Sequence, residues 1–474
     1  MSNEATVATP SPRMAELEEK RSLCRDLLSG TEGMIAAGER RLSRHPGETI
    51  GNYGVRLKGN TLTNFLAQAI EKANSRIFAK EITLTDIPPE IDTLLENIDL
   101  QGRDLNSFAM DVLWQSFADG VSYILIDKPM AEGVKTKADE AAKGIRPYAI
   151  HVQACCLLEV MSEMISGVQT ITRVRIRECS HVPDGEWGYV EQERIRVLIR
   201  DPATGAIGYQ LWEESQGQGN LAKEWVKIDE GATGMKRIAL VPVYTKRVGF
   251  MEGLPPFQAT AELNLDHWRV KSEQKAALTM NCFEMLAATG VDEDWVATVG
   301  PAQVQRSSND AAKFSYLSPT GKGVELAASY LKDIEAQIDT ASASLRVENG
   351  GNVTATAAAL DSEEGCAGLK AVAEAYGDAL EMVISFMAEM MGLDPAKTGD
   401  VSVNDEMGAK RGTDAGMQEL GKARLAGDLS RESYLKELQR RGEISETFDM
   451  EANAEELQSE GPNLADITGR GGGV

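Results

Sequence analysis

Residues 416–422 have the spacing GxxxxGK and are the strongest candidate for nucleotide chemistry in this chain of 474 residues. In a phosphate-binding loop the backbone N–H groups surround the phosphates, the lysine contacts them, and a following Ser or Thr holds magnesium. Ala423 occupies that last position, and the flanking sequence has a helical pattern with no strand before it. The match is therefore interpreted as coincidence.

The histidines and cysteines show no spacing that is typical of a metal site or an activated nucleophile. None of the four histidines forms HExxH, and the six cysteines contain no CxxC pair. Cys179 and His181 lie two residues apart, but two ligands do not make a zinc site. No GxSxG motif is present. We expect no enzyme activity, no cofactor, no metal, and cysteines in the reduced state.

The composition is strongly acidic, with 73 Asp and Glu against 49 Lys and Arg, a net charge of −24 and a pI near 4.7. This charge argues against a protein that grips nucleic acid through its phosphates, but it suits one that DNA passes without sticking. Arginines alternate along predicted strands at 173–177 and 194–200 and could contact phosphate. We favour a solvated face on which they pair with Glu178, Glu191 and Glu193.

Hydrophobic periodicity predicts a mixed α and β protein that is mainly helical, and it predicts no membrane span and no signal peptide. We expect a soluble protein made in a cytoplasm. A run of strand formers at 121–127 predicts a buried strand, and alternation between 148 and 247 predicts an antiparallel sheet. Helices are predicted at 14–28, 53–78, 91–99, 105–118, 255–289, 324–346, 357–392, 405–426 and 430–441; short strands at 295–299 and 313–317; disorder at 1–13 and 469–474.

The helix predicted at 255–289 would be about 50 Å long at 1.5 Å per residue, and it carries apolar residues on two flanks. An ordinary surface helix has a single apolar stripe. The first flank consists of Ala259, Leu263, Val270 and Ala277; the second consists of Phe257, Ala261, Leu265 and Trp268. Two flanks are typical of a helix in a ring with neighbours on both sides, or of a helix wedged between two elements of its own chain. The pattern leaves both readings open.

Four stretches of the chain, in order, resemble the bacteriophage portal proteins of the DUF4055 type. Together they span residues 45–392. They are His45-Pro46-Gly47-Glu48 with Tyr53 and Arg56-Leu57; Asn97-Ile98-Asp99 through Pro129; Pro242 through Trp268, including Ala261-Glu262-Leu263-Asn264 and His267-Trp268; and Thr354 through Met391.

The resemblance implies a portal fold assembled as a ring, usually of twelve subunits. The implied parts are a wing of helices and antiparallel sheet at 14–250, stem helices at 251–290 and 324–346, a small α/β clip at 291–323, a tunnel loop at 347–356, a helix returning to the wing at 357–395 and a helical crown at 396–468.

The implied function is a DNA conduit at one capsid vertex of the virion, for genome packaging, retention and ejection. The implied partners are further copies of the chain, double-stranded DNA, the large terminase subunit, a major capsid or scaffold protein and a head–tail adaptor, with no membrane. The alternatives are a phage-associated hydrolase with an unrecognised site, and a structural adaptor or scaffold protein that forms no ring.

The candidate site residues lie on the long helix and on the implied tunnel loop. Lateral contacts between stems are expected at Phe257, Leu263, Leu265, Trp268 and Val270. Residues expected to face the channel and its DNA are Lys271, Lys275, Asn349, Gly350, Gly351 and Asn352.

Overall fold

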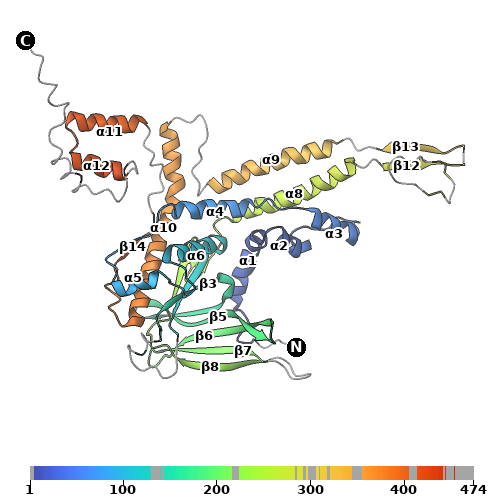
Figure 1. Cartoon of the computed structure of the whole chain (residues 1–474). Helices are drawn as coiled ribbons and strands as arrows, with labels where there is room; N and C mark the ends of the chain where they lie inside the picture. The colour runs from blue at the N-terminus through green and yellow to red at the C-terminus, as the bar shows by residue number, and fades with distance from the viewer. Residues whose placement is uncertain are drawn as a thin grey trace, which may run out of the picture. The chain divides into compact units, whose positions relative to one another are not determined.

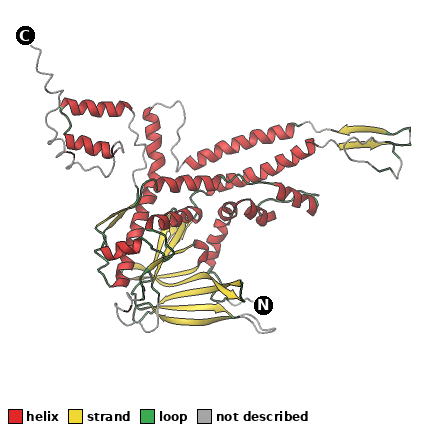
Figure 2. Ribbon diagram, in the orientation of Figure 1, coloured by secondary structure: helices red, strands yellow, loops and turns green. Residues whose placement is uncertain are grey.

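The computed structural model of the chain describes residues 5–129, 139, 143–215, 224–282, 285–291, 295–296, 306–308, 310–317, 321–343, 355–404, 414–440, 444 and 453. The chain divides into two compact units. Unit 1 comprises Met1–Arg346 and Ala367–Asp405, and unit 2 comprises Val347–Cys366 and Glu406–Val474. The structure mixes helices and sheets, which confirms the predicted α+β class (Figures 1 and 2).

Helices make up most of the first 120 residues of unit 1, and several begin at a residue whose side chain caps the first turn. Ser11, Thr49 and Asp104 each accept a hydrogen bond from a backbone N–H three residues ahead. The helices are α1 (Pro12–Leu28), α2 (Gly30–Ala37), α3 (Ile50–Gly59), α4 (Phe65–Ile77), α5 (Pro89–Leu95) and α6 (Leu105–Asp119), with the short turn η1 (Gly38–Arg40) after α2.

The region predicted as one antiparallel sheet forms two sheets. One has the order β3–β2–β9, with β2 (Val121–Asp127) between β3 (Tyr148–Val152) and β9 (Leu240–Tyr244). β2 is buried along nearly its whole length, which confirms the predicted buried strand. The turn η2 (Ala154–Cys156) leads to the other sheet, a five-stranded meander of β4 (Leu157–Ile165), β5 (Val168–Asp184), β6 (Gly188–Arg200), β7 (Ile207–Glu214) and β8 (Trp225–Ala232).

The remaining elements of unit 1 include a long helical hairpin. α8 (Gln258–Cys282) and α9 (Lys322–Ala343) lie side by side, with the paired strands β12 (Met285–Thr289) and β13 (Lys313–Leu317) at their far end (Figure 1). Two short strand pairs are β10 (Arg247–Gly249) with β11 (Glu252–Gly253), and β1 (Thr83–Thr85) with β14 (Asp400–Ser402). α10 (Ala355–Met391) contributes residues to both units.

Two helices predicted from periodicity end differently in the structure. The helix predicted at 53–78 is two helices, because Asn64 caps a new start by accepting a hydrogen bond from Ala67 N. The long helix ends at Cys282 instead of Thr289, because residues 285–289 pair with β13. The backbone N–H and C=O groups of residues 285–289 form their hydrogen bonds with β13, so these residues do not have to continue the helix. The strand predicted at 313–317 is confirmed.

The two ends of unit 1 also differ from the prediction. Residues 5–13, predicted to be disordered, pack on the meander. Val7 and Ala8 pack against the buried cluster of Leu158, Ile195 and Val197, and Ser11 N donates to Leu158 O at 2.9 Å. β14, which lies within the range 396–468 predicted as a crown, pairs with β1 and belongs to unit 1. The predicted tail at 469–474 lies outside the described residues.

Unit 2 contains α11 (Asp414–Ala426) and α12 (Arg431–Arg440). Both were expected from periodicity, at 405–426 and 430–441; residues 405–413 and 441 lie outside the described residues. The GxxxxGK stretch lies entirely within α11, which confirms its predicted helical pattern, and most backbone N–H groups of a helix bond within the helix. The absence of nucleotide chemistry stays a prediction.

A close backbone contact fixes where α8 leaves the body of unit 1. Gly120, at the end of α6, has φ +85°, and a Cβ on it would lie 2.1 Å from the carbonyl carbon and oxygen of Leu254. A Cβ on Gly253 would lie 2.4 Å from Gly120 O. Only glycine fits both positions, because any side chain would enter the opposing backbone.

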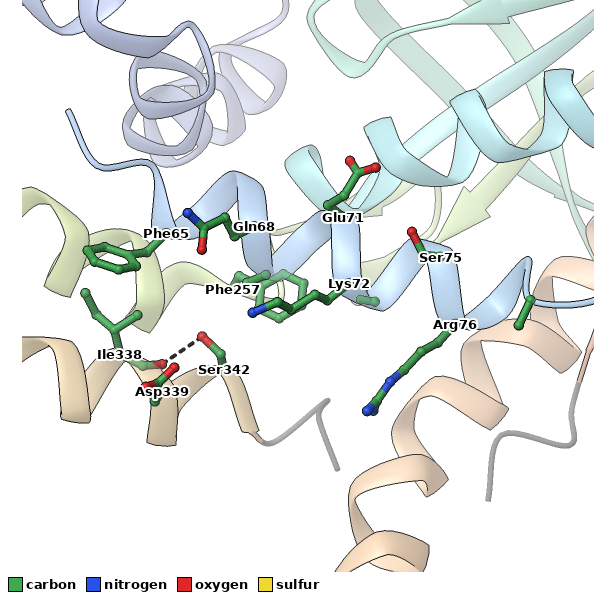
Figure 3. A pocket seen from close by; sticks show the side chains of 13 residues that line it. Phe65, Gln68, Glu71, Lys72, Ser75, Arg76, Phe257, Ile338, Asp339 and Ser342 are labelled. Carbon is green, nitrogen blue, oxygen red and sulfur yellow. Dashed lines mark hydrogen bonds between the residues drawn. The ribbon is translucent and has the colours of Figure 1, made fainter. Parts of the chain in front are cut away.

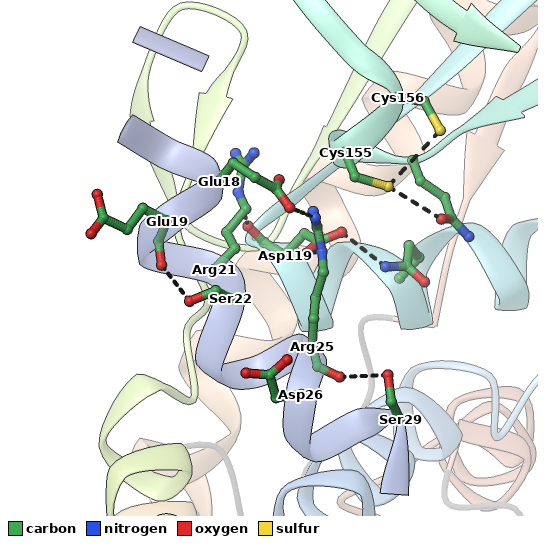
Figure 4. A network of polar contacts seen from close by, with 12 residues as sticks. Glu18, Glu19, Arg21, Ser22, Arg25, Asp26, Ser29, Asp119, Cys155 and Cys156 are labelled. Atoms are coloured by element: carbon green, nitrogen blue, oxygen red, sulfur yellow. Dashed lines mark hydrogen bonds and ion pairs between the residues drawn. The ribbon is translucent and has the colours of Figure 1, made fainter. Parts of the chain in front are cut away.

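The buried guanidinium of Arg21 ties the two sides of this contact together (Figure 4). Its Nε donates to Asp119 O at 3.0 Å and its Nη2 donates to Gly253 O at 2.7 Å. The carboxylate of Asp119 is itself buried and pairs with Arg25 at 2.9 Å. α1 therefore holds the end of α6 against the segment that leads into α8. Arg21, Asp119, Gly120, Gly253 and Leu254 are called the α8 corner below.

We predict that Gly120→Ala destabilises unit 1 by about 3 kcal/mol or more, because it combines a positive φ with a collision against backbone. Gly102→Ala is the matched control: Gly102 has φ +93° but nothing within 4 Å of the added Cβ. The control should cost only about 1–2 kcal/mol. Urea denaturation followed by tryptophan fluorescence measures both. Equal losses for the two variants would show that the close contact does not matter.

Candidate functional site

The candidate site is the helical hairpin, defined as α8, β12, β13 and α9, because α8 carries most of the predicted site residues. One flank of α8 is buried in its own chain: Phe257 is 3% exposed, Trp268 is fully buried, and Leu265 is buried as well. The Phe257 ring lies 5.9 Å from the ring of Phe117 on α6. The structure thus places these three predicted lateral contacts in the core of the single chain, where no surface is left for a neighbour.

A polar face of α8 is held by the loop between α3 and α4. The Asn264 amide donates to Thr63 O at 2.9 Å and accepts from Leu66 N at 3.2 Å, and the residue is fully buried. Asn60 Nδ2 donates to Trp268 O at 2.8 Å. These bonds satisfy buried polar groups on both partners and fix the register between helix and loop.

The two lysines predicted to face the channel contact the same loop. Lys271 Nζ donates to Thr63 Oγ1 at 2.8 Å, and Lys275 Nζ donates to Gly59 O at 2.9 Å. Burial lowers the pKa of Lys271 from its usual value. Both ammonium groups are used as internal anchors of α8. The other predicted channel residues, Asn349, Gly350, Gly351 and Asn352, lie outside the described residues.

The early motif around residue 45 also folds onto α8. Arg56 pairs with Glu48 at 2.8 Å and with Glu273 of α8 at 3.3 Å, and His45 lies 3.0 Å from the same Glu273 carboxylate. Arg269 Nε donates to Arg41 O at 2.9 Å. Two stretches separated by about 200 residues in the sequence thus form one contact. Sequence reasoning gave these residues no role beyond the resemblance.

α9 is held mainly by α8. Leu331, Ile334 and Ile338 follow one another at steps of three and four residues, and all three are buried. Two polar contacts cross between the helices. They are His267 Nε2 with Glu335 Oε1 at 3.3 Å, and Tyr330 OH with Asp266 Oδ2 at 3.0 Å.

A cavity of about 380 Å³ separates α9 from α4 (Figure 3). Lys72 and Arg76 line it from α4, Phe257 lines it from the start of the α8 segment, and Asp339 and Ser342 line it from α9. Ser342 Oγ donates to Ile338 O within its own helix.

The other flank of α8 keeps part of its apolar surface exposed. Leu263 and Val270, both predicted lateral contacts, are only half-buried, and Leu278 is exposed. On α9, Leu326 is 72% exposed and Tyr330 is also exposed. These five residues are called the apolar flank. The lateral role of Leu263 and Val270 stays a prediction.

The predicted arginine strip on the meander is mostly neutralised. Arg177 pairs with Glu193 at 2.7 Å and Arg196 pairs with Glu178 at 2.6 Å, as the solvated-face interpretation expects. Glu191 instead lies 3.7 Å from His181. A face whose charges are paired offers little to a phosphate backbone.

Within the described part of the chain, no group of three or more His, Cys, Asp and Glu has the arrangement of a metal site. Cys24, Cys155, Cys156, Cys179 and Cys282 are free thiols. Among the described helices, none combines the length and the apolar character that crossing a membrane requires.

The architecture is that of a mixed α and β protein with an anchored two-helix hairpin. A family described as "Domain of unknown function (DUF4055)" matches residues 256–391, which is 136 of the 474 residues and includes the hairpin and α10. The match thus supports the DUF4055 resemblance over the C-terminal part of its range. No curated protein matches the chain.

Two solved structures are similar over most of the chain at low identity. "Neck of empty GTA particle computed with C6 symmetry" is 12% identical with a TM-score of 0.38, covering 85% of this chain and 96% of that one. "Neck of native GTA particle computed with C12 symmetry" has the same identity and TM-score, covering 88% and 99%. Likenesses at this TM-score carry no argument about this chain.

We predict that Asn264→Ala lowers the stability of unit 1 by about 1–3 kcal/mol, because it leaves the buried Leu66 N without its partner and removes the bond to Thr63 O. The control is Glu262→Ala, an exposed position on the same helix, with an expected change of about 0.5 kcal/mol or less. Hydrogen exchange of α8 amides locates the effect. Unchanged exchange in α8 of the Asn264 variant would contradict the anchoring role.

We also predict that the folded chain loses stability in mild acid because of His267, which lies between α8 and α9. Burial lowers the pKa of His267 below its usual 6.5, more strongly than Glu335 raises it, and Lys271 lowers it further. Below pH 6.5 the unfolded chain therefore binds a proton that the folded chain resists, so stability falls as pH falls through this range. His267→Gln should flatten the dependence of the melting temperature on pH between about 6.5 and 5. If the melting temperature changes equally with pH in His267→Gln and in the unmodified protein, His267 is not the source of the pH dependence.

Proposed function

We propose that the protein is a bacteriophage portal protein, which assembles as a ring, usually of twelve copies, at one vertex of the capsid. In this proposal double-stranded DNA passes through the ring during packaging and ejection. The terminase large subunit docks on the ring during packaging, a head–tail adaptor docks later, and the capsid or scaffold protein surrounds it.

The observation that carries the proposal is the helical hairpin with its exposed apolar flank. Two long antiparallel helices are anchored in the body at one end, and the two-stranded β12–β13 pair lies at the other. Leu263, Val270, Leu278 and Leu326 keep apolar surface that a solitary hairpin would leave in water. The hairpin corresponds to the stem and clip that the motif resemblance implies, and the family match covers it.

The charge of the chain supports a conduit rather than a DNA-binding surface. Twelve copies would carry 12 × −24 = −288 formal charges, partly neutralised by ions. Such a wall repels phosphates and offers few counterion-releasing contacts, so DNA can slide. Lys271 and Lys275 donate hydrogen bonds within the chain, which would leave them less available to DNA in such a conduit. We propose that the protein performs no bond chemistry of its own.

We predict that Leu263→Glu and Val270→Glu give folded chains that do not assemble, because each places a charge on a half-buried lateral surface. Leu265→Glu is the matched contrast: Leu265 is buried within the chain, so this variant should lose about 3 kcal/mol or more of stability instead. Native mass spectrometry gives the oligomer, and circular dichroism gives the folding.

Val55→Glu, at an exposed position on α3 outside the hairpin, should assemble like the unmodified protein. If Leu263→Glu forms a closed ring at the same concentration as the unmodified protein, the flank does not make the lateral contacts. A chain that stays monomeric even with the capsid and scaffold proteins of its phage would sink the portal proposal and favour a non-ring adaptor.

A further inference from the structure

The outer part of the β5–β6 hairpin extends beyond the meander. β4 pairs with β5 only up to Ile176, and β7 pairs with β6 only from Arg194 onward. Between these limits, residues 179–193 pair only with one another among the described strands. They are called the ribbon. A two-stranded ribbon with no further layer is marginally stable in water, which suggests that something covers it.

The ribbon carries exposed aromatic residues that are flanked in the sequence by acidic residues. Trp187 is 90% exposed and Tyr189 is 67% exposed, which is unusual for such large apolar side chains. Residues 179–193 contain four carboxylates, Asp184, Glu186, Glu191 and Glu193, and no lysine or arginine. A partner that suits this ribbon must offer an apolar pocket with positive charge at its rim.

The same chain contains a pocket of that kind. A cavity of about 450 Å³ lies among the start of β5, strands β9 and β10, and α10, with an apolar lining that includes Met382 and Phe386. Two arginines line it: Arg237 lies 4.7 Å over the Phe386 ring, and Arg247 lies 5.1 Å over the Tyr244 ring. Asp378 is the carboxylate in the lining. An indole entering here would meet aromatic and methionine side chains next to two guanidinium groups.

A chain cannot fill its own pocket with its own ribbon. Val168, at the first position of β5, lines the pocket, whereas Asp184, at the last position of β5, lies at the tip of the ribbon. Sixteen residues of extended strand separate them, roughly 50 Å at about 3.3 Å per residue. The contact can form only between two copies of the chain.

We infer that the ribbon of one copy docks in this pocket of the next copy, with Trp187 as the anchor. Ribbon and pocket are different surfaces, so the contact is head-to-tail and repeats around a closed ring. The inference rests on the proposed ring and names a second contact in it, on the body of the subunit and separate from the apolar flank of the hairpin.

The test is the protein concentration at which half of the full-length chain is assembled, measured by native mass spectrometry and sedimentation. Trp187→Ala should raise it about tenfold or more, because a central aromatic anchor is lost. Ile50→Ala is the control, since Ile50 is also highly exposed but lies on α3. Trp187 is exposed, so its replacement should leave the circular dichroism of the chain unchanged.

Charge reversal gives an independent readout. Glu186→Lys and Arg247→Glu should each raise the half-assembly concentration, and the double variant should recover much of the loss, because the two charges then attract again. Arg237 is less suitable, because it already pairs with Glu389 at 3.3 Å.

The outcomes separate this contact from the ring itself. If Trp187→Ala and Arg247→Glu form rings with the same half-assembly concentration as the unmodified protein, the inferred docking is wrong and the portal proposal is unaffected. Assembly that weakens in Trp187→Ala and in each single charge reversal, and that recovers in the double reversal, supports the docking. Open oligomers of the unmodified chain that vanish in Trp187→Ala would support the docking and count against the ring. A strict monomer under all conditions would overturn both.

Discussion

The contact of two backbones at the α8 corner is the constraint on which the rest of unit 1 depends. Gly120 and Gly253 approach so closely that neither position accepts a side chain, and Arg21 binds carbonyl oxygens from both sides. Burying a guanidinium costs free energy unless its N–H donors are hydrogen-bonded. The corner is therefore stable only when both backbone segments that accept from Arg21 are in place. Assembly of the corner therefore sets the position and direction in which α8 starts.

From that start, α8 is used differently on its different faces. Phe257, Leu265 and Trp268 belong to the core, and burial of such side chains contributes roughly 2–3 kcal/mol each. Asn264 and Lys271 fasten the next face to the loop between α3 and α4. With those faces occupied by its own chain and α9 on another side, the flank with Leu263 and Val270 keeps apolar surface for a neighbouring molecule. Of the two apolar flanks in the sequence of this helix, the one with Trp268 packs inside the chain and the one with Leu263 faces outward.

Periodicity predicted the fold class, the buried strand at 121–127, the meander and the two long helices, because each depends on local spacing of apolar residues. It could not predict which flank of α8 is internal, since that depends on Phe117 and Asn60, which are remote in sequence. It also missed the end of α8 at Cys282. Met285 to Thr289 are acceptable in a helix, and only the pairing with β13 decides for a strand. The order at residues 5–13 likewise comes from a distant partner, Leu158.

The placement of Lys271 and Lys275 changes how the proposed conduit would work. Their ammonium groups donate to Thr63 Oγ1 and Gly59 O, and these bonds within the chain would compete with contacts to a passing phosphate backbone. The arginines of the meander are likewise largely paired with carboxylates. A ring built from such subunits would have few free cations in these regions to bind DNA. In that arrangement the basic residues give the subunit its rigidity, and the excess of carboxylates keeps DNA from adhering while it moves.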